Sequence, residues 1–470
     1  MRGILANIQS LPKVSDHMLK IKTDSRKIKS GDTFVALRGI SSDGHSYIDR
    51  AIQSGATTIV AEEGSYSVET IIVPDTRKYL EETLYEKYKS YLDEMIFIGI
   101  TGTNGKTTSA FLIYEALNKL NKPCAYIGTI GFYLSEKVAE LHNTSPDLCD
   151  LYEMFIEAYE NGFKHISIEV SSQGLAYGRF NNIHFDYAIF TNLTQDHLDY
   201  HLTMDNYALA KQTLFKQLKE TGLGMINVDS DYNEYFRIGN YTTYGFGESD
   251  YQIKNLLLRA DGSFFQVNDL NIATSLIGKY NVYNILCAVM VLENLRFPKE
   301  KIEKIIPTLN PPAGRMELVK YNDNTIIIDY AHTPDAMKNI FDTVKEIEHN
   351  HIYVVFGCTG SRDRKKRPIM MQMALDIADY VFVTSDDLHE EDFNVIVTDM
   401  LEGNKKKHYM VEKDRGLSVK MAIDKLDSKD LLLILGKGHE EFIIVFDKNI
   451  PFNDRKEVLK IIKEKELIEI

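Results

Sequence analysis

The chain has 470 residues, 44% of them hydrophobic, which is enough for about three domains with sizeable cores. Its formal net charge of −14 argues against nucleic-acid binding through a broad basic surface. No signal peptide and no apolar run of about eighteen residues is present, so neither a leader nor a membrane span is expected. The four cysteines (Cys124, Cys149, Cys287 and Cys358) are scattered without metal-ligand spacing, which favours a reduced, cytoplasmic protein.

The first block, residues 1–92, is predicted to be a small α/β domain. Short strand-like runs occur at 33–37, 57–63 and 69–75, separated by polar turns, and a charged helical segment at 79–94 closes the block.

The second block, residues 93–311, alternates apolar runs with helical patterns. The runs at 95–100, 165–170, 187–193 and 223–228 are typical of buried parallel strands, so a mainly parallel sheet is predicted. The breaker LNPPAG at 309–314 marks the next boundary. The alternation restarts in residues 312–470, with runs at 325–331, 352–358, 380–387 and 431–438, which predicts a separate C-terminal α/β domain.

A glycine-rich turn, GTNGKTT, joins the strand at 95–100 to a helical segment at 107–122. It matches the end of the phosphate-loop pattern G-x-x-x-x-G-K-[ST], although Ile100 stands where the first glycine is expected. Backbone N–H groups of such a turn can cradle phosphates, with Lys106 on the β/γ-phosphates and a hydroxyl of Thr107 or Thr108 on Mg²⁺. The alternative is a plain strand–helix turn with a solvated lysine. We favour an ATP site.

Polar residues after the next strands could complete that site. Glu169 ends a predicted strand, where a metal-binding carboxylate belongs, although a structural acid is the simpler explanation of that stretch alone. Two histidines and two aspartates follow in QDHLDYH (195–201). In the predicted helix at 205–220, Lys211 lies within an apolar stripe of Tyr207, Leu214, Phe215 and Leu218, a costly place for a cation unless it is paired, altered or snorkelling.

With these motifs, the chain resembles the Mur ligases, ATP-dependent amide-forming enzymes of peptidoglycan precursor synthesis. In that family the phosphate loop reads GTNGKTT without the upstream glycine. The segments TDSRKIKSGDTFVALRGISSDGHSYI, NTSPD, LIGKYNVYN, PAGRMELV, IIDYAHTPDAM, FGCTGSRDRKKRP and LGKGHEEF match, in order, the MurE type, which adds the third peptide residue. The resemblance implies a UDP-binding first domain (1–92), a central P-loop-type ATPase domain (93–311) and a Rossmann-like C-terminal domain (312–470) that binds the amino acid.

The resemblance also implies site residues. The expected ATP-binding residues are Gly102, Thr103, Asn104, Gly105, Lys106, Thr107, Thr108, Asn284, Arg315, Asp329 and His332. The expected contacts to the UDP-linked substrate are Thr23, Ser25, Ile40, Ser41, Ser42, Asn143, Thr144, Ser145, Ser171, Tyr177 and Arg179, although Tyr177 replaces a glutamine of some members. Thr107, Glu169, His197 and a carbamylated Lys211 are expected to hold Mg²⁺, and Lys106, His197 and Lys211 to be catalytic.

The implied reaction activates the γ-carboxylate of D-glutamate in UDP-MurNAc-L-Ala-D-Glu as an acyl-phosphate, which an amine then attacks. A folylpolyglutamate-type or cyanophycin-type ligase and a slow nucleotide switch are the alternatives. The expected amino-acid contacts are Arg362, Asp386, Asp387, Leu388, His389, Gly436 and Glu440. Members that take meso-diaminopimelate carry D-N-P-R where this chain has Asp386-Asp387-Leu388-His389. Because acids would attract a distal ammonium, L-lysine is predicted first and L-ornithine second, with meso-diaminopimelate as the alternative and a monomer as the working form.

Overall fold

The structure, a computed structural model, describes residues 20–39, 42–141, 143–259, 262–345, 347–446 and 448–468. The chain divides into two compact units. The first combines Met1–Ile96 with Pro146–Lys164 and Ala176–Ile183, and the second comprises Phe97–Ser145, His165–Leu175 and His184–Ile470. The chain therefore leaves the first unit after Ile96 and returns to it twice. The domain boundaries near residues 92 and 311 stay predictions.

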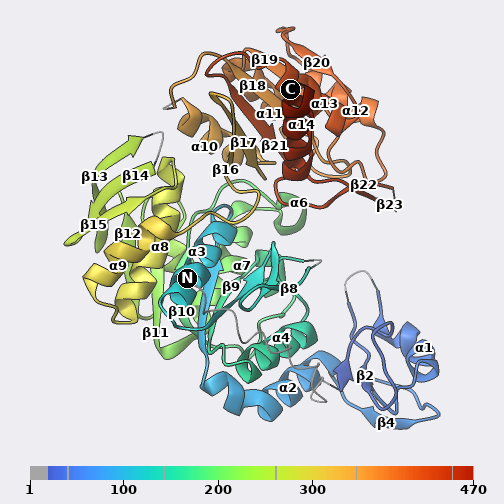
Figure 1. Cartoon of the computed structure of the whole chain (residues 1–470). Coiled ribbons are helices and arrows are strands. Elements are labelled where there is room, and N and C mark those ends of the chain that lie inside the picture. The colour runs from blue at the N-terminus through green and yellow to red at the C-terminus, as the bar shows by residue number, and fades with distance from the viewer. Residues whose placement is uncertain are drawn as a thin grey trace, which may run out of the picture. The chain divides into compact units, whose positions relative to one another are not determined.

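The first unit contains a four-stranded parallel sheet in the order β1-β2-β3-β4, drawn in blue in Figure 1. Its strands are β1 (Ile21–Lys22), β2 (Thr33–Val35), β3 (Thr58–Ala61) and β4 (Glu69–Ile72), and its early helices are η1 (Gly44–Tyr47), α1 (Ile48–Gln53) and α2 (Thr76–Asp93). Phe34 and Ile59 of the sheet pack with Ile48 and Ala51 of α1 in a small core. Because all four strands run in one direction, the loops that follow them lie along one edge of the sheet.

The second segment of the first unit supplies α4 (Leu148–Glu160), which packs on α2. The rings of Tyr88 on α2 and Tyr152 on α4 lie 6.1 Å apart. Lys27 forms an ion pair with Asp150 at 2.7 Å, and Lys22 pairs with Glu153. These contacts explain why a segment far along the chain belongs to the first unit.

The second unit contains an eleven-stranded sheet in the order β15-β14-β13-β12-β11-β10-β5-β9-β6-β7-β8. The strands β13, β12, β11, β10 and β5 pair parallel, as do β9 and β6, whereas the ends of the sheet pair antiparallel. The strands are β5 (Ile96–Thr101), β6 (Cys124–Gly128), β7 (Gly131–Tyr133), β8 (Lys137–Ala139), β9 (His165–Glu169), β10 (Phe185–Phe190), β11 (Leu218–Asn227), β12 (Tyr241–Gly245), β13 (Tyr251–Arg259), β14 (Gly262–Val267) and β15 (Leu270–Thr274).

Helices connect these strands. They are α3 (Lys106–Lys119), α5 (Ser172–Ala176), α6 (Leu198–His201), α7 (Met204–Lys216), η2 (Asn233–Phe236), α8 (Lys279–Asn294), α9 (Lys299–Ile305) and η3 (Ile306–Thr308). Helices α3 and α8 pack against each other, and both are lined with buried apolar residues.

A six-stranded sheet forms the C-terminal part of this unit, in the order β16-β17-β21-β18-β19-β20. Only the edge strand β16 pairs antiparallel. The strands are β16 (Glu317–Tyr321), β17 (Asn324–Asp329), β18 (Ile352–Phe356), β19 (Tyr380–Val383), β20 (Tyr409–Val411) and β21 (Leu431–Leu435), followed by the hairpin β22 (Phe442–Val445) and β23 (Lys448–Pro451).

Helices cover both faces of the C-terminal sheet. Helices α10 (Pro334–Val344), α11 (Lys366–Ile377) and α12 (Phe393–Leu401) pack on one face, and α13 (Arg415–Asp424) and α14 (Asp454–Ile468) on the other. Neighbouring residues of β17 serve opposite cores: Ile327 faces the first set of helices, and Ile326 and Ile328 face the second. The predicted class, α/β with mainly parallel sheets, is confirmed.

One predicted element differs from the structure. The helix predicted at 205–220 ends at Lys216, and Leu218 begins β11 instead of continuing the apolar stripe. Leu218 pairs with Phe185 of β10, so sheet pairing overrides the local helical pattern there.

The four cysteines are all buried and form no disulfide. Burial raises the pKa of Cys149 and of Cys358 to about 12 and that of Cys287 to about 11. Burial also raises the pKa of Cys124. Within the described residues, no helix is both long and apolar enough to cross a bilayer.

Candidate active site

The phosphate loop connects the buried strand β5 to α3 through two glycines with positive φ, Gly102 at 149° and Gly105 at 85°. A Cβ on Gly102 would lie 2.0 Å from Thr191 Oγ1, and one on Gly105 would lie 2.6 Å from Asn284 Oδ1. Both positions therefore require glycine, for backbone conformation and for space. The loop leaves the N-terminus of α3 open to an anion, as a phosphate site requires.

Two lysines converge on this loop. Lys106 Nζ donates hydrogen bonds to the carbonyl oxygens of Gly102 (2.9 Å) and Thr103 (2.8 Å), and Lys211 Nζ donates to that of Gly102 (2.7 Å). Lys211 is 1% exposed and lies over the ring of Tyr207. Burial, and then the charge of Lys106, lower the pKa of Lys211 well below its ordinary value. Burial also lowers the pKa of Lys106, against the opposing charges of Glu169 and Asp196.

Glu169 is completely buried and accepts four hydrogen bonds. Tyr126 OH and Thr129 N donate to Oε1, and Thr107 Oγ1 (2.9 Å) and Thr129 Oγ1 (3.1 Å) donate to Oε2. Gly128 makes room for this carboxylate, because a Cβ there would lie 2.2 Å from Oε1. The strand-end acid predicted from the sequence thus directly contacts the helix that follows the phosphate loop.

The oxygens of Thr107 and Glu169 fit Mg²⁺, which proteins bind through one or two carboxylates together with substrate phosphates and water. Among the described residues no group of three or more His, Cys, Asp or Glu side chains could hold a metal ion by itself. A magnesium site here would therefore be completed by the nucleotide.

The cluster at 195–201 separates into two parts. His197 begins α6 with a left-handed backbone (φ 52°), and its Nε2 lies 3.4 Å from Asp196 Oδ2. His201 is buried, bonds to Ser172 Oγ at 2.9 Å and stacks on Tyr207. Burial opposes ionisation of Asp196, yet the charges of His197, His332 and Lys106 lower its pKa. Asp196 was not among the predicted site residues, although it lies in the same motif as His197.

A cavity of about 70 Å³ adjoins the phosphate loop. Six predicted ATP-binding residues line it: Asn104, Gly105, Thr108, Asn284, Arg315 and Asp329. The sequence prediction missed the remaining lining residues, Tyr280, Asn281, Met316, Ala336, Asn339 and Ile340. The side chains of Asn281 and Asn284 are hydrogen-bonded to each other at 3.0 Å, which holds two amides at the wall.

Three predicted ATP-binding residues come after the predicted domain boundary near residue 311: Arg315, Asp329 and His332. Arg315 Nη2 lies 3.4 Å from Thr107 Oγ1, and its guanidinium lies 4.4 Å from the centre of the Tyr330 ring. Asp329 accepts the backbone N–H groups of Met316 (2.7 Å) and Ala331, and burial raises its pKa. Burial, followed by the charge of Lys366, lowers the pKa of His332 to about 4, so this ring stays neutral near pH 7.

The residues predicted to contact the UDP-linked substrate lie in both units. In the second, Ser145 Oγ donates to Glu169 O (3.2 Å) and accepts from Ser171 N (3.0 Å), Thr144 bonds to Thr129, and Asn143 is exposed. In the first, Arg179 pairs with Asp147 at 3.0 Å and lies over the ring of Tyr177, whereas Thr23, Ser25 and Ser42 follow β1 and β2. Ile40 and Ser41 lie outside the described residues.

The predicted amino-acid site gathers at the carboxyl ends of β19 and β21. Asp386 and Asp387 are buried, and Asp387 Oδ1 accepts from Lys437 Nζ (2.7 Å) and Ile444 N (2.8 Å). Lys437 also pairs with Glu440. Asp386 Oδ2 is buried and accepts no hydrogen bond within the part of the chain that is described, and a Cβ on Gly436 would lie 2.5 Å from it.

The other residues of this group take different places. Leu388 is part of the core, His389 has a left-handed backbone (φ 49°) and bridges to Val445, and Arg362 is exposed. Arg415 fixes the two strand ends: its guanidinium donates to the carbonyls of Ser385 (3.1 Å) and Leu435 (2.9 Å) and pairs with Asp454 at 2.8 Å. The sequence offered no signal for this clamp.

The fold and the loop define a nucleotide-using α/β enzyme, and comparison with known proteins gives the family. Family models match at residues 17–90 (Mur ligase family, catalytic domain), 100–292 (Mur ligase middle domain) and 314–438 (Mur ligase, glutamate ligase domain). The chain belongs to the Mur ligase family, whose members are ATP-dependent, ADP-forming ligases that use Mg²⁺. The predicted family, enzyme class and cofactors are confirmed.

Some relatives match this chain over nearly its whole length, and they share one name. The chain is 37% identical to the UDP-N-acetylmuramoyl-L-alanyl-D-glutamate--2,6-diaminopimelate ligases of Clostridium botulinum (95% of each chain) and Fusobacterium nucleatum (96% and 95%). A solved ligase of the same name matches with a TM-score of 0.68 at 30% identity over 96% and 95% of the two chains. MurF ligase from Thermotoga maritima in complex with ADP shares the fold, with a TM-score of 0.68 at 18% identity over 97% and 100%.

Proposed function

We propose that this protein joins a diamino acid to the γ-carboxylate of D-glutamate in UDP-MurNAc-L-Ala-D-Glu, with hydrolysis of ATP to ADP and phosphate. The observation that carries the proposal is the convergence of Lys106, Lys211 and Glu169 around the Gly102–Thr107 loop, in a chain aligned end to end with ligases named for this substrate. A cytoplasmic location and a monomeric state stay predictions.

The chemistry begins with a carboxylate, which resists nucleophiles because of its charge. Transfer of the γ-phosphoryl group of ATP makes an acyl-phosphate, the amine attacks its carbonyl carbon, and phosphate leaves. Lys106 uses two of its three donors on the loop carbonyls, so one remains for a phosphate oxygen, where its charge would offset the charge that develops during transfer.

Bound Mg²⁺ would add further neutralisation of the phosphates, with Thr107 and Glu169 as oxygen ligands and His197 and a carbamylated Lys211 beside them. The rest of the catalytic effect would come from holding the reactants in position. The rigid turn around Gly102 and Gly105 holds the phosphates, and the cavity lined by Asn284 and Arg315 takes the rest of the nucleotide.

Two observations point to different diamino acids as the substrate. The names of the relatives favour 2,6-diaminopimelate, whereas the loop Asp386-Asp387-Leu388-His389 carries acids that favour L-lysine. Lys437 already pairs with Asp387, whereas Asp386 Oδ2 accepts no hydrogen bond among the described residues, so Asp386 is the acid of this loop that we expect to contact a ligand ammonium. L-lysine, with ornithine second, stays a prediction that rests on Asp386.

A folylpolyglutamate-type ligase is the alternative within the superfamily. Folylpolyglutamate synthase of Mycobacterium tuberculosis shares the fold at 15% identity over 76% of this chain, so part of this chain has no counterpart in that match. The deciding experiment measures amino-acid-dependent phosphate release with UDP-MurNAc-L-Ala-D-Glu and, separately, with a folate substrate. Release only with the folate, or release that ignores the amino acid, would contradict the proposal.

A further inference from the structure

The loop after β2 in the first unit is closed by a polar network that none of the predicted contacts includes. Arg38 and Asp43 pair as an isolated antiparallel bridge, and Gly39 N donates to Ser42 O (2.9 Å) and Gly44 N to Leu37 O (2.8 Å). A Cβ on Gly44 would lie 2.6 Å from the backbone of Leu37. Residues 37–39 and 42–44 therefore form the two sides of a tight hairpin, and these bonds tie the two sides together.

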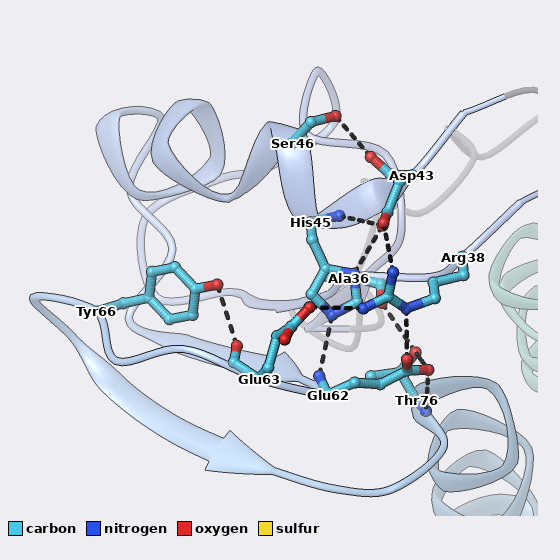
Figure 2. Close-up of polar contacts among 9 residues, drawn as sticks. All are labelled: Ala36, Arg38, Asp43, His45, Ser46, Glu62, Glu63, Tyr66 and Thr76. Atoms are coloured by element: carbon cyan, nitrogen blue, oxygen red, sulfur yellow. Dashed lines mark hydrogen bonds and ion pairs between the residues drawn. The ribbon is translucent and has the colours of Figure 1, made fainter.

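Arg38 is the centre of the network shown in Figure 2. Its guanidinium contacts three carboxylates, those of Asp43 (2.8 Å), Glu62 (2.5 Å) and Glu63 (2.8 Å). Asp43 lies on the far side of the hairpin, whereas Glu62 and Glu63 follow β3. The arginine thus connects the hairpin to the end of the neighbouring strand.

His45 makes a second connection, and its bonding partners determine its tautomer. Its Nε2 accepts the backbone N–H of Glu62 at 3.0 Å, so the ring proton sits on Nδ1 and is donated to Asp43 Oδ1 at 2.7 Å. Asp43 also accepts the backbone N–H of His45, and this bond is the main reason why the pKa of Asp43 is lowered. The ring of His45 therefore connects Asp43 of the hairpin to the backbone of Glu62, just after β3.

Glu62 joins the network to α2. Its Oε1 faces Thr76 at the start of that helix (3.4 Å to Oγ1), and Thr76 Oγ1 donates to Ala36 O at 2.8 Å. The carboxylate lies at the positive end of the helix, where a negative charge is stabilised. Three sets of contacts therefore stabilise this region: the bonds across the hairpin, the bonds to Glu62 after β3, and the bonds of Thr76 at the start of α2.

The position of the hairpin in the sheet indicates what the network could do. It lies at the carboxyl edge of a parallel sheet, where α/β proteins bind ligands, and Thr23 and Ser25 follow β1 at the same edge. Exposed ion pairs such as those of Arg38 contribute little to stability. What such a network does well is to hold a loop in one conformation.

We propose that Arg38, Asp43, His45 and Glu62 are positioning residues that hold the two sides of this hairpin, 37–39 and 42–44, in place for the nucleotide end of the UDP-linked substrate. The inference rests on the proposed function, which names the UDP-linked substrate, together with the expectation from the family resemblance that Ser42 contacts its nucleotide end. None of the four residues needs to contact the substrate. Their effect is expected on its binding, and not on ATP or on the chemical step.

The test compares Arg38→Met, His45→Gln and Asp43→Asn with the wild type in steady-state ligation and by calorimetric titration of the UDP-linked dipeptide. We expect the KM and the dissociation constant for this substrate to rise about tenfold in Arg38→Met, while kcat and the KM for ATP change less than about twofold. Arg38→Lys, which keeps the positive charge but only one donor nitrogen, should recover part of the affinity. Lys89→Ala, which breaks an exposed pair with Glu86 on α2, is the matched control and should behave as the wild type.

The outcomes separate this inference from the function on which it rests. A wild type that does not ligate the UDP-linked dipeptide would remove the proposed function. A wild type that ligates, with variants that bind the dipeptide as tightly as it does, would overturn only the positioning role. A parallel fall in kcat and in affinity for all substrates would also overturn it, by indicating general disruption, and unfolding of Arg38→Met alone leaves the decision to Asp43→Asn and His45→Gln.

Discussion

The ammonium groups of Lys106 and Lys211 donate to the same acceptor, the carbonyl oxygen of Gly102, at 2.9 and 2.7 Å. Two like charges at one carbonyl are unfavourable, and the lowered pKa of Lys211 reflects both its burial and its neighbour. A neutral amine is the form that attacks CO₂, losing a proton as the carbamate forms. The conversion would exchange a repelled cation for an anion beside Lys106.

We therefore predict that Lys211 is carbamylated, as the resemblance implies. Lys211→Ala should lose most activity, and acetate or formate should restore part of it by entering the vacated anion site. A carbamate carbon signal in protein supplied with ¹³C-bicarbonate, absent from the variant, provides a check independent of activity. An unmodified amine in the active enzyme would contradict the prediction.

Lys106→Ala should remove charge neutralisation at the transferred phosphoryl group and cost about 3 kcal/mol in the barrier, more than a hundredfold in kcat. Both contacts of Lys106 stay within its own loop, so the melting temperature should change little. Single-turnover phosphate release measures the loss. Activity within tenfold of the wild type would remove Lys106 from the mechanism.

The amino-acid preference can be decided with three substrates. At equal concentrations of L-lysine, L-ornithine and meso-diaminopimelate, we expect the highest kcat/KM with lysine, and Asp386→Asn should raise the KM for lysine about tenfold. Glu390→Gln, at an exposed acid of the same loop, is the control. A clear preference for diaminopimelate would show that the acidic loop does not select the side chain.

Acid should weaken the C-terminal sheet through Glu391. Hydrogen bonds from Arg367, at 2.7 and 2.8 Å, are the main reason why the pKa of Glu391 is lowered to about 2 from an ordinary value near 4.5. Because the folded-state pKa is depressed, the carboxylate stabilises the fold fully above about pH 4.5, and this contribution disappears as the pH falls towards 2.

Glu391→Gln should therefore lower the free energy of unfolding by about 1–3 kcal/mol at neutral pH. The difference from the wild type should shrink steadily between about pH 4.5 and 2, as measured by urea unfolding at several pH values. Glu390→Gln should show no such pH-dependent difference. A constant difference across the range would mean that Glu391 acts through packing and not through its charge.

Local sequence patterns were enough to predict much of the fold. The strand at 95–100, the loop with Lys106 and the helix after it are specified within one continuous segment, residues 95–122, and the structure has β5 and α3 there. The stripe containing Lys211 lies on the buried face of α7 for the same reason. Leu218 departs from the prediction because its environment is set by β10, more than thirty residues earlier.

Partners distant in sequence account for what could not be predicted. Tyr126 and Thr129 reach Glu169 only because β6 and β9 are neighbours in the sheet, and Asn339 joins the cavity wall through the packing of α10. The pairing of Lys437 with Asp387 likewise depends on β19 and β21 ending at one edge, and it changes the charge that the acidic loop presents. Sequence alone counts these charges but does not pair them.

The four buried cysteines have a practical consequence. With thiols that are shielded and kept protonated by raised pKa values, the native chain should react slowly with maleimides near neutral pH. A single cysteine placed on an exposed helix position of each unit could then carry a fluorescent dye without prior removal of the natural thiols. Energy transfer between two such dyes would report whether the distance between the units changes during turnover in the otherwise unaltered enzyme.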